Sequence, residues 1–413
     1  MKSKREKMLR VLMLGWEFPP YNIGGLGTAC YGLTKELSKK GVKIVFVIPK
    51  SPVEPSSDFI TIINAAVNYD HLYKFVKVKS RLIPYHESYS YRGVVFKKER
   101  NKCAKVYGEE LFKEVEIYAK RVLEIAKWFD FDLIHVHDWM TYPAGINLKK
   151  KFKKKLIAHI HATEFDRSGG NPNPRVYEIE KQGFQYADRI IAVSNYTKNM
   201  VVTKYNIDPS KIEVVHNGVL FENISKDYDV KVFPDEKVVL FLGRITLQKG
   251  PDYFIEAAKV VSDMLPRVKF IITGSGDMLP WLVHRAAELG IADKVIFTGF
   301  LRGKELDMVY KMADVYVMPS VSEPFGITPL EALIRGTPVI ISKQSGVSEV
   351  LNHCLKVDFW DIRKLANHII AVLKYKELRN ELKHHGYLEV MNINWEKAAE
   401  KVLNIYYDVL SGG

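Results

Sequence analysis

Apolar strand-like runs alternate with amphipathic helical stretches along almost the whole chain, and this alternation limits the folds that the chain can adopt. The pattern runs from residue 9 to about residue 218, stops over the irregular residues 219–236, and starts again at residue 237. Alternating strands and helices favour parallel sheets with helices packed on them. The sequence therefore predicts an α/β chain of two doubly wound, Rossmann-like domains with a cleft between them. The expected strands lie at residues 9–15, 42–49, 131–137, 155–163, 188–194, 211–218, 237–244, 268–276, 293–300, 313–320 and 337–342.

Length and composition agree with two cytoplasmic domains. The 413 residues are too many for one ordinary domain, and a hydrophobic content of 47% supports packed cores. Cys30, Cys103 and Cys354 lie far apart, without the spacing of a disulfide framework or a zinc site, so we expect a reducing cytoplasm. The N-terminal apolar run VLMLGW is too short for a signal peptide, and no run is long enough to span a bilayer.

The net charge of +13 suits anionic substrates, nucleic acid or an anionic membrane. No nucleic-acid-binding motif accompanies the charge, so we expect no nucleic acid partner. The densest basic run, Lys149–Lys155, has lysines on both sides of Phe152. We expect a solvated helix end there, and peripheral contact with an anionic membrane is the alternative. The sequence leaves the oligomeric state open.

Two glutamates, Glu323 and Glu331, lie on either side of a Pro-Phe-Gly turn. Thr328, Pro329 and Glu331 follow the pattern of a helix N-terminus, with Thr328 as N-cap, Pro329 as first helical residue and Glu331 completing a capping box. Glu323 lies before this helix and after the apolar run 313–320, where no capping rule requires a carboxylate. Open α/β sheets bind their ligands at such strand ends.

The loop between the two glutamates is suited to a phosphorylated sugar. The backbone amides of Gly326, Ile327 and Thr328 lie at the expected helix start and favour an anion such as phosphate. Glu323 would repel an anion at close range, so we expect it to face a neutral part of the ligand that is rich in hydroxyl groups.

Two cations, Arg244 and Lys249, follow the buried run that begins at residue 237. Such a pair can clamp a diphosphate, because arginine offers a fork of donors and lysine a point charge. The alternative is a solvated surface pair.

Polar residues and glycines also follow the expected strands of the first half. Gly24 and Gly25 lie in a glycine loop that lets the backbone approach a ligand, although a plain strand-to-helix turn fits as well. Asp138 comes after another strand and can orient a hydroxyl. His161 ends a third strand beside a polar loop, where it can bind a sugar hydroxyl or assist a reaction electrostatically.

No metal site and no cofactor are expected. His159 and His161 share one face of their strand by period-two alternation, but no third ligand with suitable spacing accompanies them. His135 is expected to be a core histidine. The D-x-D pairs at residues 130–132 and 227–229 do not lie at the carboxyl end of a strand, so neither is expected to hold Mg²⁺.

Taken together, these residues resemble the retaining, nucleotide-sugar-dependent glycosyltransferases of families 4 and 5, which have the GT-B architecture and include glycogen and starch synthases. The resemblance runs from about residue 9 to residue 400. Glu323 and Glu331 match the E-x7-E motif of these families, and Arg244 and Lys249 match their R-x4-K pair. The other matches are Gly24 and Gly25 in the glycine loop, Asp138 in an H-D-W motif, His161, and residues 216–219, which lead into the second domain.

The resemblance implies an organisation for the chain. It predicts an acceptor domain at residues 1–218, a donor domain at residues 219–393, and a last helix at residues 394–413 that packs back on the first domain. Closure of the cleft would then assemble the site.

The resemblance also implies roles for the matching residues. Arg244, Lys249 and the amides near Gly25 and the start of the helix would hold the donor diphosphate and stabilise it as it leaves, in place of a metal. Glu323 would contact the donor sugar, and Glu331 would bind the ribose. His161 would bind the sugar near its reacting carbon, and Asp138 would lie towards the acceptor. Same-face attack by the acceptor, assisted by the leaving phosphate, would retain the anomeric configuration. The residues expected to take part in catalysis are Glu323, His161, Arg244, Lys249 and Asp138.

One position departs from the pattern of family 5. Asn22 replaces the lysine that usually begins the glycine loop, and the lead-in WEFPP is closer to family 4, which has broader substrates. The expected reaction moves glucose from UDP- or ADP-glucose to an α-glucan or related glucoside. The alternatives are a family-4 enzyme with another sugar donor and a lipid-linked or small-molecule acceptor, a GT-B epimerase or phosphorylase, and a regulator that only binds sugar nucleotides.

Overall fold

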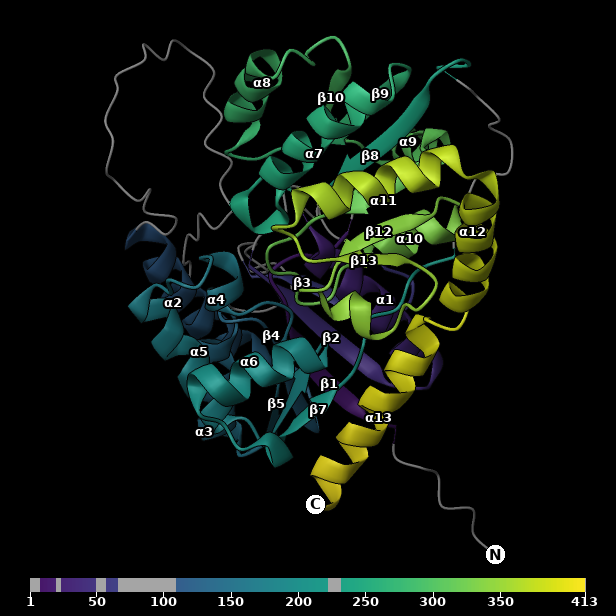
Figure 1. Ribbon diagram of the computed structural model, residues 1–413. Helices are drawn as coiled ribbons and strands as arrows, with labels where there is room; N and C mark the ends of the chain where they lie inside the picture. Colours follow the sequence, from purple (N-terminus) through teal and green to yellow (C-terminus); the bar gives the residue numbers. More distant parts are fainter. Residues whose placement is uncertain (1–7, 20–23, 50–56, 66–108, 222–231, 413) are drawn as a thin grey trace, which may run out of the picture. The chain divides into compact units, whose positions relative to one another are not determined.

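A computed structural model describes residues 8–19, 24–49, 57–65, 109–221 and 232–412. Asn22, Cys103, the pair at residues 227–229 and most of the stretch 50–105 lie outside these ranges. Within them, strands and helices alternate as the sequence predicts, and the strands form two parallel sheets (Figure 1). The predicted α/β fold with two doubly wound sheets is confirmed.

The first sheet has seven strands in the order β3-β2-β1-β4-β5-β6-β7. β1 pairs in parallel with both β2 and β4, so the strand order reverses next to β1. Doubly wound sheets bind ligands beyond the carboxyl ends of the strands at such a reversal. The strands are β1 (Arg10–Leu14), β2 (Lys43–Ile48), β3 (Thr61–Asn64), β4 (Leu133–His137), β5 (Lys155–Ile160), β6 (Arg189–Ala192) and β7 (Ile212–Val214).

Helices follow the strands of the first sheet. α1 (Gly25–Lys39) comes after β1, and α3 (Tyr142–Phe152) comes after β4. Proline lies in the first turn of α3, where a missing N–H leaves no helix hydrogen bond unmade. The other helices of this half are α2 (Glu109–Ile125), η1 (Ala126–Trp128), α4 (Glu164–Arg167), α5 (Pro174–Tyr186), α6 (Asn195–Tyr205) and η2 (Pro209–Lys211).

The second sheet has six strands in the order β10-β9-β8-β11-β12-β13. Its central strand β8 is buried on both faces, because Val239 and Phe241 pack into one apolar cluster and Val238 and Leu240 into another. Burial on both faces explains why this run is continuously apolar in the sequence. The strands are β8 (Lys237–Leu242), β9 (Val268–Thr273), β10 (Val295–Gly299), β11 (Val315–Met318), β12 (Val339–Ser342) and β13 (Leu355–Val357).

The helices of the second half begin with η3 (Leu247–Lys249) and α7 (Pro251–Met264), which follow β8. Within the described ranges, no helix has the length and apolar character that a membrane span needs. The other helices are α8 (Leu279–Glu288), α9 (Gly303–Met312), α10 (Thr328–Ile334), η4 (Gly346–Glu349), α11 (Ile362–Lys374), α12 (Lys376–Val390) and α13 (Trp395–Ser411).

The chain forms two compact units. The first contains residues 1–159, 179–189 and 406–413, and the second contains residues 160–178 and 190–405. The end of α13 therefore belongs with the first sheet, and the hydroxyl of Tyr406 lies 2.5 Å from Nδ1 of His135 in β4. The domain boundaries at residues 218 and 393 stay predictions.

Candidate active site

Glu323 lies in the loop between β11 and α10, beyond the carboxyl end of its strand, as the sequence predicts. Its N–H donates to the carbonyl of Gln344 at 3.0 Å, and its own carbonyl accepts from Gly346 at 2.9 Å. The Glu323 residue is only 7% exposed. The loop then turns at Gly326, whose φ is +100° and where a Cβ would lie 3.1 Å from Cγ of Glu323. Glycine therefore lets the turn pass close to the carboxylate side chain.

Lys249 forms an ion pair with Glu323 through Nζ and Oε2. Ser320 donates to the same carboxylate oxygen at 3.5 Å. Lys249 ends η3, and the next residue, Gly250, has a φ of +65°. A Cβ at Gly250 would lie 2.1 Å from the carbonyl oxygen of Pro319, so only glycine lets η3 pack against the loop after β11.

Arg244 is linked to the loop of Glu323 through the side chain of Gln248. Its Nη2 donates to Oε1 of Gln248 at 3.2 Å, and Nε2 of Gln248 donates to the carbonyl of Ser322 at 3.2 Å. The two predicted cations and Glu323 thus lie together in the second compact unit, where the ends of β8 and β11 are neighbours.

The contacts of Glu331 show that the predicted capping box is wrong. The N-cap of α10 is Ile327, whose side chain makes no capping hydrogen bond, and Thr328 is already helical. The hydroxyl of Thr328 instead accepts from Tyr316 at 2.8 Å, and Oε2 of Glu331 accepts from the hydroxyl of Tyr310 at 2.9 Å. Burial raises the pKa of Glu331, while Arg335 and the Tyr310 hydroxyl oppose the rise. The Glu331 carboxylate is therefore held by tertiary contacts rather than by its own helix.

Gly24, Gly25 and Asp138 lie in the first compact unit, at the ends of β1 and β4. Gly24 is the N-cap of α1, Gly25 is its first residue, and a Cβ at either position would meet no described atom within 4 Å. Asp138 has a φ of +59° and is 4% exposed. A buried aspartate in the left-handed region is an uncommon, strained conformation of the kind that clusters at functional sites.

The histidines of β4 and β5 form a buried cluster that the sequence reasoning did not predict. His135 lies inside the protein, which confirms it as a core histidine, and its Nε2 lies 3.2 Å from Nδ1 of His159. His137 stacks on His135 with ring centroids 4.5 Å apart. One ring nitrogen of each of the three histidines lies within 4.8 Å of the others. His161 is half-buried directly after β5, in the second compact unit.

The remaining polar motifs have structural partners. Asp132 accepts two hydrogen bonds from the guanidinium of Arg10, which also pairs with Asp130 at 3.0 Å. In the basic run, Nζ of Lys149 donates to Asp188 at 2.6 Å, and α3 ends at Phe152. The predicted helix end is confirmed, and contact with a membrane stays an untested alternative.

A buried carboxyl beside the Glu323 loop also escaped the sequence reasoning. Asp166 is 1% exposed and accepts from the hydroxyl of Ser322 at 2.5 Å and from the N–H of Thr163 at 2.7 Å. Burial raises the pKa of Asp166, and the hydrogen bonds from Ser322 and Thr163 oppose the rise. The pattern Thr163-x-x-Asp166 signals the capping box that the structure shows, but it gives no sign of the contact with Ser322.

Two families match the chain. The starch synthase catalytic domain family matches residues 10–211, and the family of glycosyl transferases group 1 matches residues 224–389. An uncharacterized glycosyltransferase of Methanocaldococcus jannaschii is 30% identical over 96% of this chain and 98% of its own length. A glycogen synthase of Mycobacterium tuberculosis is 26% identical over 83% of this chain and 80% of its own length.

The architecture also matches a solved enzyme. The catalytic domain of starch synthase IV from Arabidopsis thaliana, bound to ADP and acarbose, superposes with a TM-score of 0.70 and 14% identity over 98% of this chain and all of that one. The chain belongs to the glycosyltransferases of GT-B fold. Within that class, its first part is similar to the starch synthase catalytic domain, and most of its length is similar to a glycogen synthase.

Proposed function

We propose that the protein transfers a glucosyl group from UDP- or ADP-glucose to an α-glucan or a related glucoside, with retention of the anomeric configuration. The observation that carries the proposal is the group formed by Lys249, Glu323 and Arg244 at the ends of β8 and β11. Cations beside a carboxylate suit a ligand with a diphosphate at one end and a sugar at the other. The similarity to a glycogen synthase and to a starch synthase bound to ADP and acarbose supports this donor and this acceptor.

In the proposed reaction, the acceptor oxygen attacks the anomeric carbon on the face from which the diphosphate leaves. The bond from the anomeric carbon to the diphosphate oxygen breaks, the new glycosidic bond forms, and the proton of the acceptor hydroxyl passes to the diphosphate. Lys249 and Arg244 neutralise the charge that develops on the leaving group. Glu323 faces the glucosyl group, and Glu331 binds the ribose hydroxyls.

Residues outside this group complete the proposal. His161 binds the glucosyl group near its reacting carbon, and Asp138 orients the acceptor. The amides near Gly25 and at Gly326–Thr328 donate to the diphosphate. The strained backbone of Asp138 supports a role beyond packing, since its conformation is otherwise costly.

A panel of nucleotide sugars tests the proposal. UDP and ADP derivatives of glucose, mannose and N-acetylglucosamine are incubated with and without glycogen, maltose and glucose 1-phosphate, and nucleotide release is measured. We expect glucan-dependent release of UDP or ADP from the glucose donors. Turnover only with a mannose or N-acetylglucosamine donor, or no turnover with any glucan, would instead support an enzyme with a lipid-linked or small-molecule acceptor. Activity with sugar phosphate alone would indicate a phosphorylase, and donor consumption without any acceptor an epimerase.

Chelation of divalent cations is expected to leave this activity unchanged. Arg244 and Lys249 supply positive charge at the leaving group, the task that a bound metal performs in other transferases. The rate of nucleotide release is compared before and after dialysis against EDTA. Full loss of activity that Mg²⁺ restores would contradict the prediction. It would favour the D-x-D pairs as metal ligands, including Asp130–Asp132 beside Arg10.

A further inference from the structure

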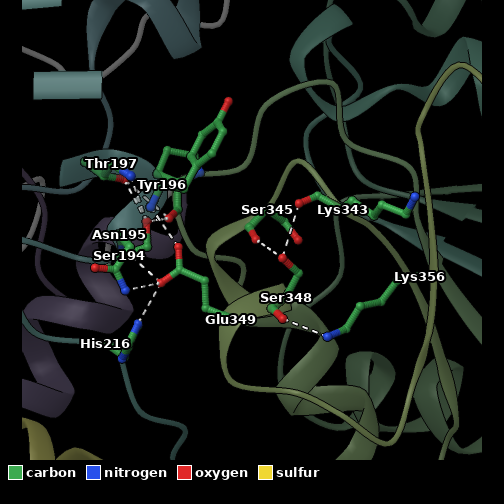
Figure 2. A network of polar contacts seen from close by, with 11 residues as sticks. Ser194, Asn195, Tyr196, Thr197, His216, Lys343, Ser345, Ser348, Glu349 and Lys356 are labelled. Carbon is green, nitrogen blue, oxygen red and sulfur yellow. Dashed lines mark hydrogen bonds and ion pairs between the residues drawn. The ribbon is translucent and has the colours of Figure 1, made fainter. Parts of the chain in front are cut away.

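Glu349, the last residue of η4, binds the N-terminus of α6 (Figure 2). Its Oε1 accepts from the N–H of Tyr196 at 2.7 Å, and its Oε2 accepts from the N–H and the side-chain amide of Asn195 at 2.9 and 3.1 Å. Nε2 of His216 lies 3.0 Å from the same oxygen. The first N–H groups of a helix lack partners within the helix, and the helix dipole favours an anion there. The carboxylate therefore satisfies donors that α6 cannot satisfy itself.

These contacts keep Glu349 ionised. Burial alone would raise the pKa of Glu349, but the hydrogen bonds from His216, Asn195 and Tyr196 outweigh burial and lower the pKa. Only 22% of its side chain is exposed. A charged group held in this way forms stronger hydrogen bonds than a neutral one.

The same turn of α6 also holds the loop that carries Glu323. Ser194, the N-cap of α6, donates to the carbonyl of Pro324 at 2.5 Å. The hydroxyl of Tyr196 lies 3.0 Å from Oγ of Ser322. The residues immediately before and after Glu323 are thus both bonded to the start of α6.

The element that presents Glu349 is bonded to this loop as well. The N–H groups of Gly346 and Val347, at the start of η4, donate to the carbonyls of Glu323 and Phe325 at 2.9 and 2.7 Å. A Cβ at Gly346 would lie 2.2 Å from the carbonyl oxygen of Pro324. Glycine at this position therefore lets η4 and the loop pack backbone against backbone.

The far side of η4 is fixed to the second sheet (Figure 2). Nζ of Lys356, in β13, donates to the carbonyl of Ser348 at 2.8 Å. Oγ of Ser348 donates to the carbonyls of Ser345 and Lys343 at 2.6 and 3.2 Å. Glu349 is therefore presented by a short helix that is tied to the sheet on one side and to the Glu323 loop on the other.

We propose that Glu349 is a positioning residue for sugar transfer: its carboxylate clamps the start of α6 onto η4 and thereby holds the loop of Glu323 in place. The effect on transfer rests on the proposed function, in which Glu323 contacts the donor sugar. Glu349 acts through the loop, because its bonds go to α6 and His216 rather than to the Lys249–Glu323 pair. Without its carboxylate, the N–H groups of Asn195 and Tyr196 lose their acceptor. The start of α6, which is bonded to the residues on both sides of Glu323, is then no longer held against η4 by Glu349.

The chain offers a matched control in Glu389 of α12. This carboxylate accepts from the N–H and side-chain amide of Asn352 and from the N–H of His353, each at 2.9 Å, and lies 3.3 Å from Nδ1 of His353. The chemistry repeats that of Glu349, but these partners do not bond to the loop of Glu323 or to α6. Loss of Glu389 therefore reports the general effect of losing such a carboxylate.

The test compares Glu349→Ala, Glu349→Gln and Glu389→Ala in the full chain. Because displacing a catalytic group by about 1 Å costs up to about 100-fold in rate, we expect Glu349→Ala to lower kcat about 10- to 100-fold with little change in donor KM. Glu349→Gln keeps the volume and one acceptor oxygen, so it should lose less and stays informative if the alanine variant does not fold. Glu389→Ala should retain kcat within about twofold, as expected of a substitution away from the site. Unchanged kcat in both Glu349 variants, or equal losses in Glu349→Ala and Glu389→Ala, would overturn the proposal.

Hydrogen exchange separates this proposal from the proposed function. If the wild type transfers no sugar from any donor, the proposed function fails, yet the positioning of the loop remains measurable. We then expect the amides of residues 319–328 to exchange faster in Glu349→Gln than in the wild type and in Glu389→Ala, since local opening is read out by exchange. Equal exchange in the three proteins would show that Glu349 does not hold the loop.

Discussion

Replacing Lys249 with alanine is expected to lower turnover about 100-fold or more, the usual cost of removing a group that stabilises charge in a transition state. Lys249 is held in place by its ion pair with Glu323 and by the turn at Gly250. Alanine removes the positive charge from the leaving diphosphate and leaves the buried Glu323 carboxylate without its partner. Steady-state rates of nucleotide release give kcat and the donor KM, and we expect the loss mainly in kcat.

Lys259→Ala is the control for this variant. Lys259 lies in the next helix, α7, and forms an ion pair with Asp263 at 2.7 Å, where the side chains are 38% and 58% exposed. Exposed pairs of this kind contribute little to stability, so turnover should stay close to that of the wild type. Turnover like that of the wild type in Lys249→Ala would exclude Lys249 from the binding of the diphosphate.

The strands and the positions of the two cations could be predicted because both follow from burial. A central parallel strand such as β8 is covered on both faces, so its sequence is continuously apolar and its carboxyl end marks a ligand-binding edge. The pairing of β8 with β11 then brings Arg244, Lys249 and Glu323 to one edge. The direct ion pair between Lys249 and Glu323 depends on side-chain directions in two loops, which no local pattern specifies.

The predicted capping box of Thr328 and Glu331 was wrong because tertiary contacts replace the local ones. The pattern Thr328-Pro329-x-Glu331 satisfies a capping rule, but Tyr310 in α9 donates to Glu331 and Tyr316 in β11 donates to Thr328. The histidine cluster was missed for a related reason. Period-two alternation places His135 and His137 on one face, whereas the contact with His159 depends on the register between β4 and β5.

The contacts of Glu349 also could not be predicted from the sequence. Glu349 and Asn195 are far apart in the sequence, and neither lies in a motif that indicates the other. The glycine at position 346 was a local signal of close backbone approach, since a Cβ there would meet the carbonyl of Pro324. That signal indicates packing and gives no information about which segment packs.

Replacing Glu323 with glutamine is expected to lower kcat by about 100- to 1000-fold, with smaller changes in donor KM. Glutamine fills the same space beside Gly326 and keeps an oxygen for Ser320, so the loop should retain its fold. The variant loses the negative charge that would stabilise the positive charge on the sugar as the diphosphate leaves. Glu288→Gln, which removes an exposed carboxylate paired with Arg285, is the control and should retain the activity of the wild type.

The double variant Lys249→Ala/Glu323→Gln then measures whether the ion pair works as a unit. Groups that act together give losses that do not multiply, because the first substitution already removes what the second would remove. We expect the double variant to lose clearly less than the product of the two single losses, since each single change also leaves its partner without a counter-charge in a largely buried site. A loss equal to the product would show that Lys249 and Glu323 act independently on the diphosphate and on the sugar. Activity of Glu323→Gln within about threefold of the wild type, which is an effect below 1 kcal/mol, would remove Glu323 from the reaction altogether.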